Sequence, residues 1–261
     1  MAGSELTQVD GAAVGAWIEP GLDGFGGKVK QQVPRVYEAY ARIFHPASDQ
    51  EGNAVSWGAV AEALGTTAHR EMQWHAIVGT ADCSNFEGSR WPGGNPNLSE
   101  LDDEPLAALC AILAQHTGTP EHCYFGVSTI HAGVGEEYSR APLFRLPQRD
   151  FVILAGPLSA FDQITVEGGR GATVQVVAFI GDPPPDFDPA PEPWGVAPNL
   201  IWPEDRAWFV ATEYDFDSTL VGGSRGLVDG LLGSSELEVW EVDPEVSLQA
   251  DADGVNAVPD D

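Results

Sequence analysis

Apolar residues in the first half of the chain recur at helical spacing, which predicts a run of helices. The first is expected from Pro34 to residue 44, and the second from an N-cap at Ser56 to Gly65. Weaker periodicity predicts a third helix over 67–78. The strongly apolar segment 104–116 predicts a fourth, because its acidic start suits the positive end of a helix dipole.

The pattern changes to a β type after residue 120, where short apolar runs are separated by turn residues. A hairpin turn is expected at GGRG, residues 168–171, between two of these runs. Four strands are predicted before the chain becomes rich in proline: 122–130, 141–147, 150–158 and 172–180.

A proline-rich acidic segment, 182–198, interrupts the β-rich part of the chain and is expected to be an extended loop. Beyond it, the pattern predicts a strand at 206–214, a short helix at 224–232 and a strand at 237–242. One β-α-β unit is too small to bury a sheet of its own. We therefore expect its strands to join the sheet of the middle region.

These elements predict an α+β fold. N-terminal helices are expected to pack on a mixed, largely antiparallel sheet, and the C-terminal β-α-β unit to join the same sheet. Residues 1–30 are expected to be mostly loop, and 31–261 to form a single domain that contains the 182–198 loop. The length of 261 residues allows a substantial core, although two small domains would also fit it.

The chain is strongly acidic, with 40 Asp and Glu against 12 Lys and Arg and a formal net charge of −28. This charge argues against nucleic acid and anionic membrane surfaces as partners, because both bind clustered basic residues. The acids are concentrated at the end of the chain, where residues 182–261 hold 19 acids and 2 Arg, a net of −17 out of the total of −28. Codon bias or adaptation to salt would also produce an acidic composition.

Three cysteines, Cys83, Cys110 and Cys123, have no CxxC spacing and do not form a disulfide framework. The first twenty residues have neither a basic region nor an apolar run of signal-peptide length. No stretch is long and apolar enough to span a membrane. A cytoplasmic location with reduced thiols is therefore expected.

Three carboxylates, Glu213, Asp215 and Asp217, alternate at the predicted end of the 206–214 strand. Alternate residues of a strand point to the same side, so these oxygens together are candidate ligands for Mg²⁺ or Mn²⁺. The alternative is a solvated strand end that holds no metal.

Gly222, Gly223 and Ser224 precede the predicted helix 224–232. The unpaired N–H groups at such a helix start attract anions, which makes this turn a candidate anion-binding site. The spacing matches no nucleotide-binding motif, and a strand-to-helix turn with a serine N-cap is the alternative.

Aromatic and histidine side chains recur in the predicted helical region. Tyr37, Trp57, His69, Trp74 and His75 are candidates to line a common pocket. Packing in the hydrophobic core is the alternative explanation for the same residues.

Four phrases of the sequence carry a resemblance: YEAYARIFHPA, VSWGAVAEALG, LAQHTGTPEHCYFG and PNLIWPEDRAWFVATEYDFDSTLVGGS. Together they resemble a family of hypothetical proteins from high-GC Gram-positive bacteria, over roughly residues 35–255. No activity, cofactor or catalytic residue is established for that family. The resemblance implies a single full-length unit and implies no function.

Two functional hypotheses remain. The first is a non-enzymatic interaction protein for a basic partner, for example an inhibitor of a basic toxin of the immunity-protein type. Its partner face is expected in the acidic C-terminal third. The second is a divalent-metal-dependent enzyme or ligand-binding protein for a small anionic substrate, which would use the carboxylates and the turn described above.

Overall fold

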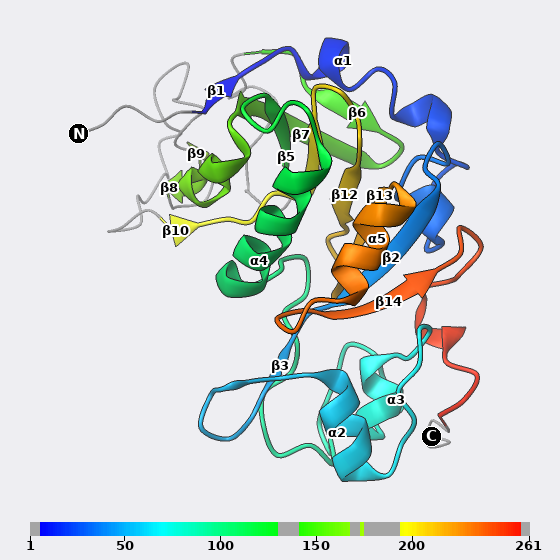
Figure 1. Ribbon diagram of the computed structural model, residues 1–261. Helices are drawn as coiled ribbons and strands as arrows, with labels where there is room; N and C mark the ends of the chain where they lie inside the picture. The colour runs from blue at the N-terminus through cyan, green and yellow to red at the C-terminus, as the bar shows by residue number, and fades with distance from the viewer. Residues whose placement is uncertain (1–5, 130–140, 168–172, 175–193, 257–261) are drawn as a thin grey trace.

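A nine-stranded sheet, antiparallel in every pairing, forms the centre of the computed structural model, which describes residues 6–129, 141–167, 173–174 and 194–256 (Figure 1). Eight of its strands follow one another from edge to edge, and the ninth, β6, pairs with β7. In spatial order they are β1 (Thr7–Gln8), β7 (Arg149–Gly156), β5 (Cys123–Ser128), β11 (Leu200–Pro203), β12 (Phe209–Thr212), β13 (Ser218–Gly223), β2 (Ala39–Phe44) and β14 (Glu238–Val242), with β6 at Phe144–Leu146.

Helices and two small sheets complete the fold, so that the predicted α+β class is confirmed. The α-helices are α1 (Gly11–Val14), α2 (Trp57–Leu64), α3 (Trp74–Val78), α4 (Asp103–Leu113) and α5 (Arg225–Leu232). The small sheets contain β3 (Ala47–Ser48) with β4 (Ala54–Val55), and β8 (Thr165–Glu167) with β9 (Thr173–Val174) and β10 (Trp194–Gly195). Short 3₁₀ turns lie at Glu19–Gly21, Val29–Gln31, Ala114–His116, Leu158–Gln163 and Ala250–Ala252. Among the described residues, no helix combines the length and apolar character needed to cross a bilayer.

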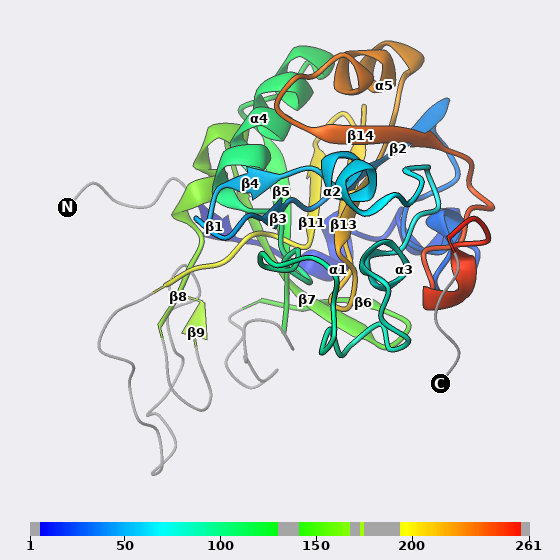
Figure 2. The ribbon, with the colours of Figure 1, turned by 90° about the horizontal axis from the view of Figure 1, so that it is seen from below.

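The two faces of the large sheet bury separate hydrophobic clusters. Helices α4 and α5 cover one face and pack on alternate strand residues such as Ala41, Phe125 and Val221 (Figures 1 and 2). On the other face, apolar residues of the N-terminal and C-terminal segments, such as Ile18 and Leu248, pack on the strands. Each strand therefore contributes its two sides to two different cores.

A third hydrophobic cluster forms a lobe around α2 and α3, which lies beyond β14 and β3 in Figure 1. We call residues 56–97 the α2–α3 lobe. Its centre is a pair of buried indoles, Trp57 and Trp74, whose rings lie 5.2 Å apart. Phe44, the last residue of β2, packs 4.7 Å from Trp57 and so belongs to this lobe as well as to the sheet.

Strand β2 replaces the helix that the spacing predicted from Pro34 to residue 44, and that prediction is wrong. All six residues of β2 are buried, because both faces of the strand are covered. A strand buried on both sides has no polar alternation, and its apolar residues then match a helical period by chance. The sequence of β2, AYARIF, does not alternate between apolar and polar residues as a half-exposed strand does.

Capping signals located two other helices correctly. The side chain of Ser56 accepts a hydrogen bond from the amide of Ala59 at the start of α2, and Gly65 ends that helix in the left-handed conformation with φ 71°. Ser224 caps α5 in the same way through the amide of Leu227. The predicted helix over 67–78 is shortened to α3. Residues 67–73 form a loop whose backbone groups hydrogen-bond to the side chains of Arg42, Asp253 and Asn256.

The last part of the chain builds a β-α-β arrangement around β2. Strands β13 and β14 both pair antiparallel with β2, one on each side, and α5 connects them. The segment 206–214 contributes β12, and β13 is a strand that the pattern missed. The GGRG turn, most of the predicted strand 172–180 and residues 182–193 of the proline-rich loop lie outside the described residues.

His45, directly after β2, is a fully buried histidine held in its neutral form. Its Nδ1 lies 2.7 Å from the carbonyl oxygen of Asn97, which can only accept, so Nδ1 carries the proton. Its Nε2 lies 2.9 Å from Thr219 Oγ1, which in turn lies 2.8 Å from Thr212 Oγ1. Burial lowers the pKa of His45 to about 4.

The neutral state of His45 predicts a loss of stability in mild acid. The unfolded chain takes up a proton near pH 6.5 while the folded chain does not until about pH 4. The free energy of unfolding should therefore fall by about 2 kcal/mol between pH 7 and pH 5 because of this one group. Urea unfolding at several pH values measures it, and the matched variants are His45→Gln and, at an exposed position, His122→Gln. The dependence of the unfolding free energy on pH should become weaker only in His45→Gln. An equal dependence in all three proteins would contradict the prediction.

Candidate functional site

A cleft in the described part of the structure lies between α4, the start of β14 and the arm that leads from β2 into α2. Its volume is about 970 Å³. Helix α4 forms one wall and the connection from α5 into β14 forms the opposite wall. The lining residues are Phe44, Pro46, Ala54, Val55, Ser56, Glu104, Pro105, Ala107, Ala108, Ala111, Ser235, Glu236, Leu237 and Glu238.

The charges that line the cleft are all negative. Glu104 and Glu236 are exposed, and neither forms an ion pair with a described residue. Among the described residues that line the cleft there is no Lys, Arg or His. The remaining walls are mostly alanine, proline, valine, leucine and phenylalanine side chains, so the cleft is apolar between acidic edges.

Glu238 joins the cleft to the N-terminus of α2. Its Oε2 accepts a hydrogen bond from the amide of Trp57 at 2.5 Å, and its Oε1 accepts one from the amide of Gly58 at 2.8 Å. Burial raises the pKa of Glu238, although these two amides act in the opposite direction. The carboxylate thus fills the anion-binding end of α2 with a group from the chain itself.

The α2–α3 lobe is tied to the sheet by Arg42, a fully buried arginine of β2. Its Nη1 donates to the carbonyl oxygens of Arg70 and Met72 at 3.3 and 3.1 Å, which lie in the loop before α3. Its Nε donates to Ser218 Oγ at 2.9 Å, and Nη2 lies 3.5 Å from Asp217 Oδ1. Burial lowers the pKa of Arg42 to about 10, so the guanidinium is charged at neutral pH.

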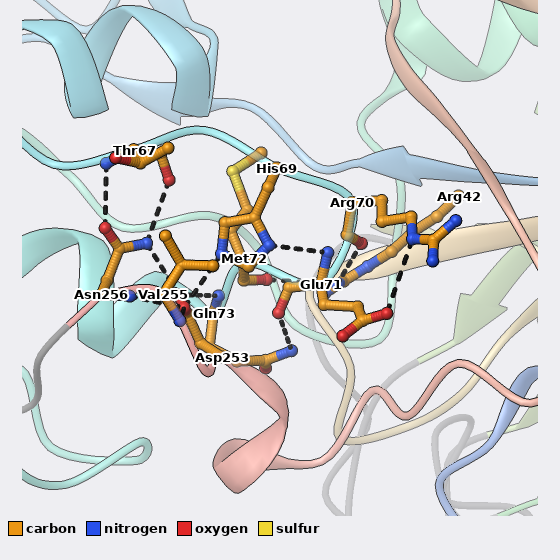
Figure 3. Close-up of polar contacts among 10 residues, drawn as sticks. All are labelled: Arg42, Thr67, His69, Arg70, Glu71, Met72, Gln73, Asp253, Val255 and Asn256. Atoms are coloured by element: carbon orange, nitrogen blue, oxygen red, sulfur yellow. Dashed lines mark hydrogen bonds and ion pairs between the residues drawn. The ribbon is translucent and has the colours of Figure 1, made fainter.

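A second tie to the lobe comes from the C-terminal segment, at Asp253 and Asn256 (Figure 3). The buried carboxylate of Asp253 accepts from His69 Nε2 at 2.9 Å and from the amide of Gln73 at 3.2 Å. Asn256 accepts from the amide of Thr67 at 2.8 Å and donates to its carbonyl oxygen at 3.0 Å. We call residues 249–256 the C-terminal latch, because they fix the loop that positions α3.

The three predicted metal ligands, Glu213, Asp215 and Asp217, lie in three different environments. Glu213 forms a 2.5 Å ion pair with Arg149, which is largely buried, and Asp217 lies beside Arg42. Asp215 is exposed in the turn between β12 and β13. Within the described part of the chain, no three His, Cys, Asp or Glu side chains gather as a metal site requires.

The predicted anion site is occupied by the protein itself. The amide of Arg225, the first residue of α5, donates to Glu38 Oε2 at 2.8 Å. Gly222 and Gly223 lie inside β13, where a Cβ on Gly222 would approach Tyr37 to 2.6 Å and one on Gly223 would approach Leu227 to 2.5 Å. Packing therefore accounts for both glycines.

The predicted aromatic pocket is divided between two cores. Trp57, Trp74 and His75 are buried in the α2–α3 lobe, whereas Tyr37 packs on the opposite side of the sheet beside Tyr40. His69 donates to the C-terminal latch. None of the five lines the cleft described above.

Sequence reasoning missed the cleft and the C-terminal latch for different reasons. Cleft residues such as Ala108 and Leu237 carry no chemical signature, and they meet only after the sheet has formed. His69 and Asp253 lie 184 positions apart, so no local pattern connects them. The exposed helical spacing of Glu104, Ala107 and Ala111 was the one available signal.

Comparison of the chain with protein-family models, with curated proteins and with solved structures gives no significant match. The geometry, burial and charge of the described residues are therefore the basis for the functional proposal.

Loss of the C-terminal latch is expected to loosen the lobe alone. Asp253→Ala removes an acceptor of five hydrogen bonds, two of them from His69 and Gln73, and each such bond contributes about 1 kcal/mol. Hydrogen exchange followed by mass spectrometry should show amides of 67–78 exchanging about tenfold faster or more, with β5 and β7 unchanged. Asp251→Ala, at an exposed neighbouring position, is the matched control. Equal exchange in both variants, or faster exchange throughout the sheet, would show that the segment does not act as a latch.

Proposed function

We propose that this chain is a cytoplasmic, non-catalytic binding protein whose partner is a basic protein. The observation that carries the proposal is the way in which the fold distributes its charges. Most of the described basic side chains form contacts within the chain, while many exposed carboxylates form no ion pair with a described residue.

Most of the described basic residues form hydrogen bonds, ion pairs or a cation–π contact with other residues of the chain. Of the 12 in the sequence, Arg140 and Arg170 lie outside the described residues, which leaves ten. Arg90 donates to the carbonyl oxygens of Leu64 and Ile77, and Arg206 lies over the ring of Trp17. Seven form ion pairs: Lys28, Lys30, Arg42, Arg70, Arg145, Arg149 and Arg225. The tenth, Arg35, is exposed and forms no ion pair with a described residue.

The acidic residues divide into two groups. Several carboxylates of the C-terminal third have structural partners, such as Asp217 with Arg42, Glu241 with Arg225 and Glu245 with Lys30. Part of the charge of that third is therefore neutralised within the fold. Exposed carboxylates that pair with no described residue occur along the whole chain, including Glu19, Glu51, Glu62, Glu87, Glu104, Asp215, Glu236 and Asp251.

This distribution supports electrostatic attraction to a cationic surface. Unpaired surface carboxylates produce a negative potential that accelerates encounter with a basic protein and repels nucleic acid and anionic lipid. The potential is screened within about 10 Å at 0.1 M salt, so association should depend strongly on ionic strength.

Affinity capture with charge variants tests the proposal. The wild type, immobilised at about 25 mM salt, should retain a basic protein from a lysate of its own cells and release it by about 500 mM salt. A bait with the amide changes E19Q, E51Q, E62Q, E87Q, D215N and D251N should retain about tenfold less of that protein. The purified partner must then bind the purified wild type with the same salt dependence.

A bait that keeps the six unpaired carboxylates but carries Asp150→Asn and Glu245→Gln is the control, because both of these exposed residues form ion pairs within the chain. It should capture as much as the wild type. Retention of no basic protein, or binding that is insensitive to salt and to the six amide changes, would contradict the proposed function.

A further inference from the structure

We infer that the cleft between α4 and β14 is the docking site for a basic amphipathic helix of the partner. This inference rests on the proposed function, since it names the place and the part of the partner that is bound. Three features support this inference: the size of the cleft, the exposed face of α4 and the position of the charges that line the cleft.

The size of the cleft suits a protein segment with several apolar side chains. Its volume of about 970 Å³ lies at the upper end of the range for ligand pockets. The floor contains Phe44 and Val55, and Leu237 lies on the wall opposite α4. An apolar cleft of this size favours binding, because filling it removes apolar surface from water.

The wall that α4 contributes has the geometry for packing against a second helix. Glu104, Ala107, Ala108 and Ala111 occupy positions i, i+3, i+4 and i+7, so they form one face of the helix. The opposite face, with Leu106, Leu109 and Leu113, is buried in the core. The alanines allow the axis of a docked helix to approach closely, as grooves between small side chains do.

The charges define the chemistry of the occupant. Glu104 lies at the first turn of α4 and Glu236 lies on the opposite wall, so Lys or Arg on both sides of a helix would meet a carboxylate. An anionic segment is excluded by the same two residues. Small anions are also excluded, because Glu238 already occupies the amides at the start of α2.

The position of the walls agrees with a preformed site. The arm from β2 into α2 is fixed by Phe44 in the core of the lobe and by Ser56 at the N-cap. Glu238 joins the same N-terminus to β14 across the cleft floor. The arm and the start of β14 are therefore tied together without a ligand, which lowers the cost of ordering this part of the site on binding.

A designed peptide tests the site directly. The probe is an 18-residue helix with Leu on one face and Lys on the other, and its companion has the same composition in an order that gives no amphipathic helix. Fluorescence anisotropy at about 25 mM salt should show the amphipathic peptide binding about tenfold more tightly than the scrambled one. Glu104→Gln with Glu236→Gln should weaken the amphipathic peptide about tenfold, and Ala108→Trp should weaken it by at least as much because it fills the cleft.

Matched variants separate the site from the overall charge. Glu62→Gln with Glu121→Gln removes two exposed charges elsewhere and should change affinity less than about twofold. Thermal unfolding followed by circular dichroism confirms that each variant is folded. The docking site is disproved if both peptides bind equally, or if the Glu104/Glu236 and Glu62/Glu121 pairs have equal effects. Salt-sensitive capture of a basic partner would in those cases persist, so the proposed function stands or falls on its own experiment.

Discussion

The buried guanidinium of Arg42 is the interaction on which the arrangement of sheet and lobe depends. It lies in β2 with no exposure to solvent, above the ring of Phe44, and its three nitrogens reach β13, the loop before α3 and Asp217. A buried charge is costly unless it is paired and hydrogen-bonded, so the loop must stay where its carbonyl oxygens satisfy this group. The position of the lobe relative to the sheet follows from that requirement.

Strand β2 contributes residues to all three hydrophobic clusters. Its odd-numbered residues face α4 and α5, Tyr40 faces the cluster under the N-terminal segment, and Phe44 enters the lobe. Such a strand joins surfaces that would otherwise be independent. The cleft lies where Phe44, the last residue of β2, pairs with Glu238, the first residue of β14. The binding surface that we propose is thus a consequence of how the sheet ends. Its carboxylates, Glu104 and Glu236, form no ion pair with a described residue.

Local signals in the sequence identified the elements whose boundaries are set locally. The helices α2 and α5 were predicted because Ser56 and Ser224 cap them, and the acidic and apolar pattern of α4 located that helix. Strand β2 was missed because burial on both faces removes the alternation that identifies a strand. Glu213 and Asp217 were predicted as candidate metal ligands, whereas in the structure they lie beside Arg149 and Arg42. These partners are set by strand pairing, which no local pattern reveals. The cleft has no motif at all, because its residues are defined by position and not by chemistry.

Backbone amide chemical shifts of the isotope-labelled protein, titrated with the amphipathic Leu/Lys peptide, test the central claim most directly. Our account predicts saturable shifts concentrated in Glu104–Ala111, Ala54–Ser56 and Ser235–Glu238, with β5 and β7 unaffected. Shifts scattered over exposed carboxylates on all sides of the protein, or confined to residues far from the cleft, would contradict it.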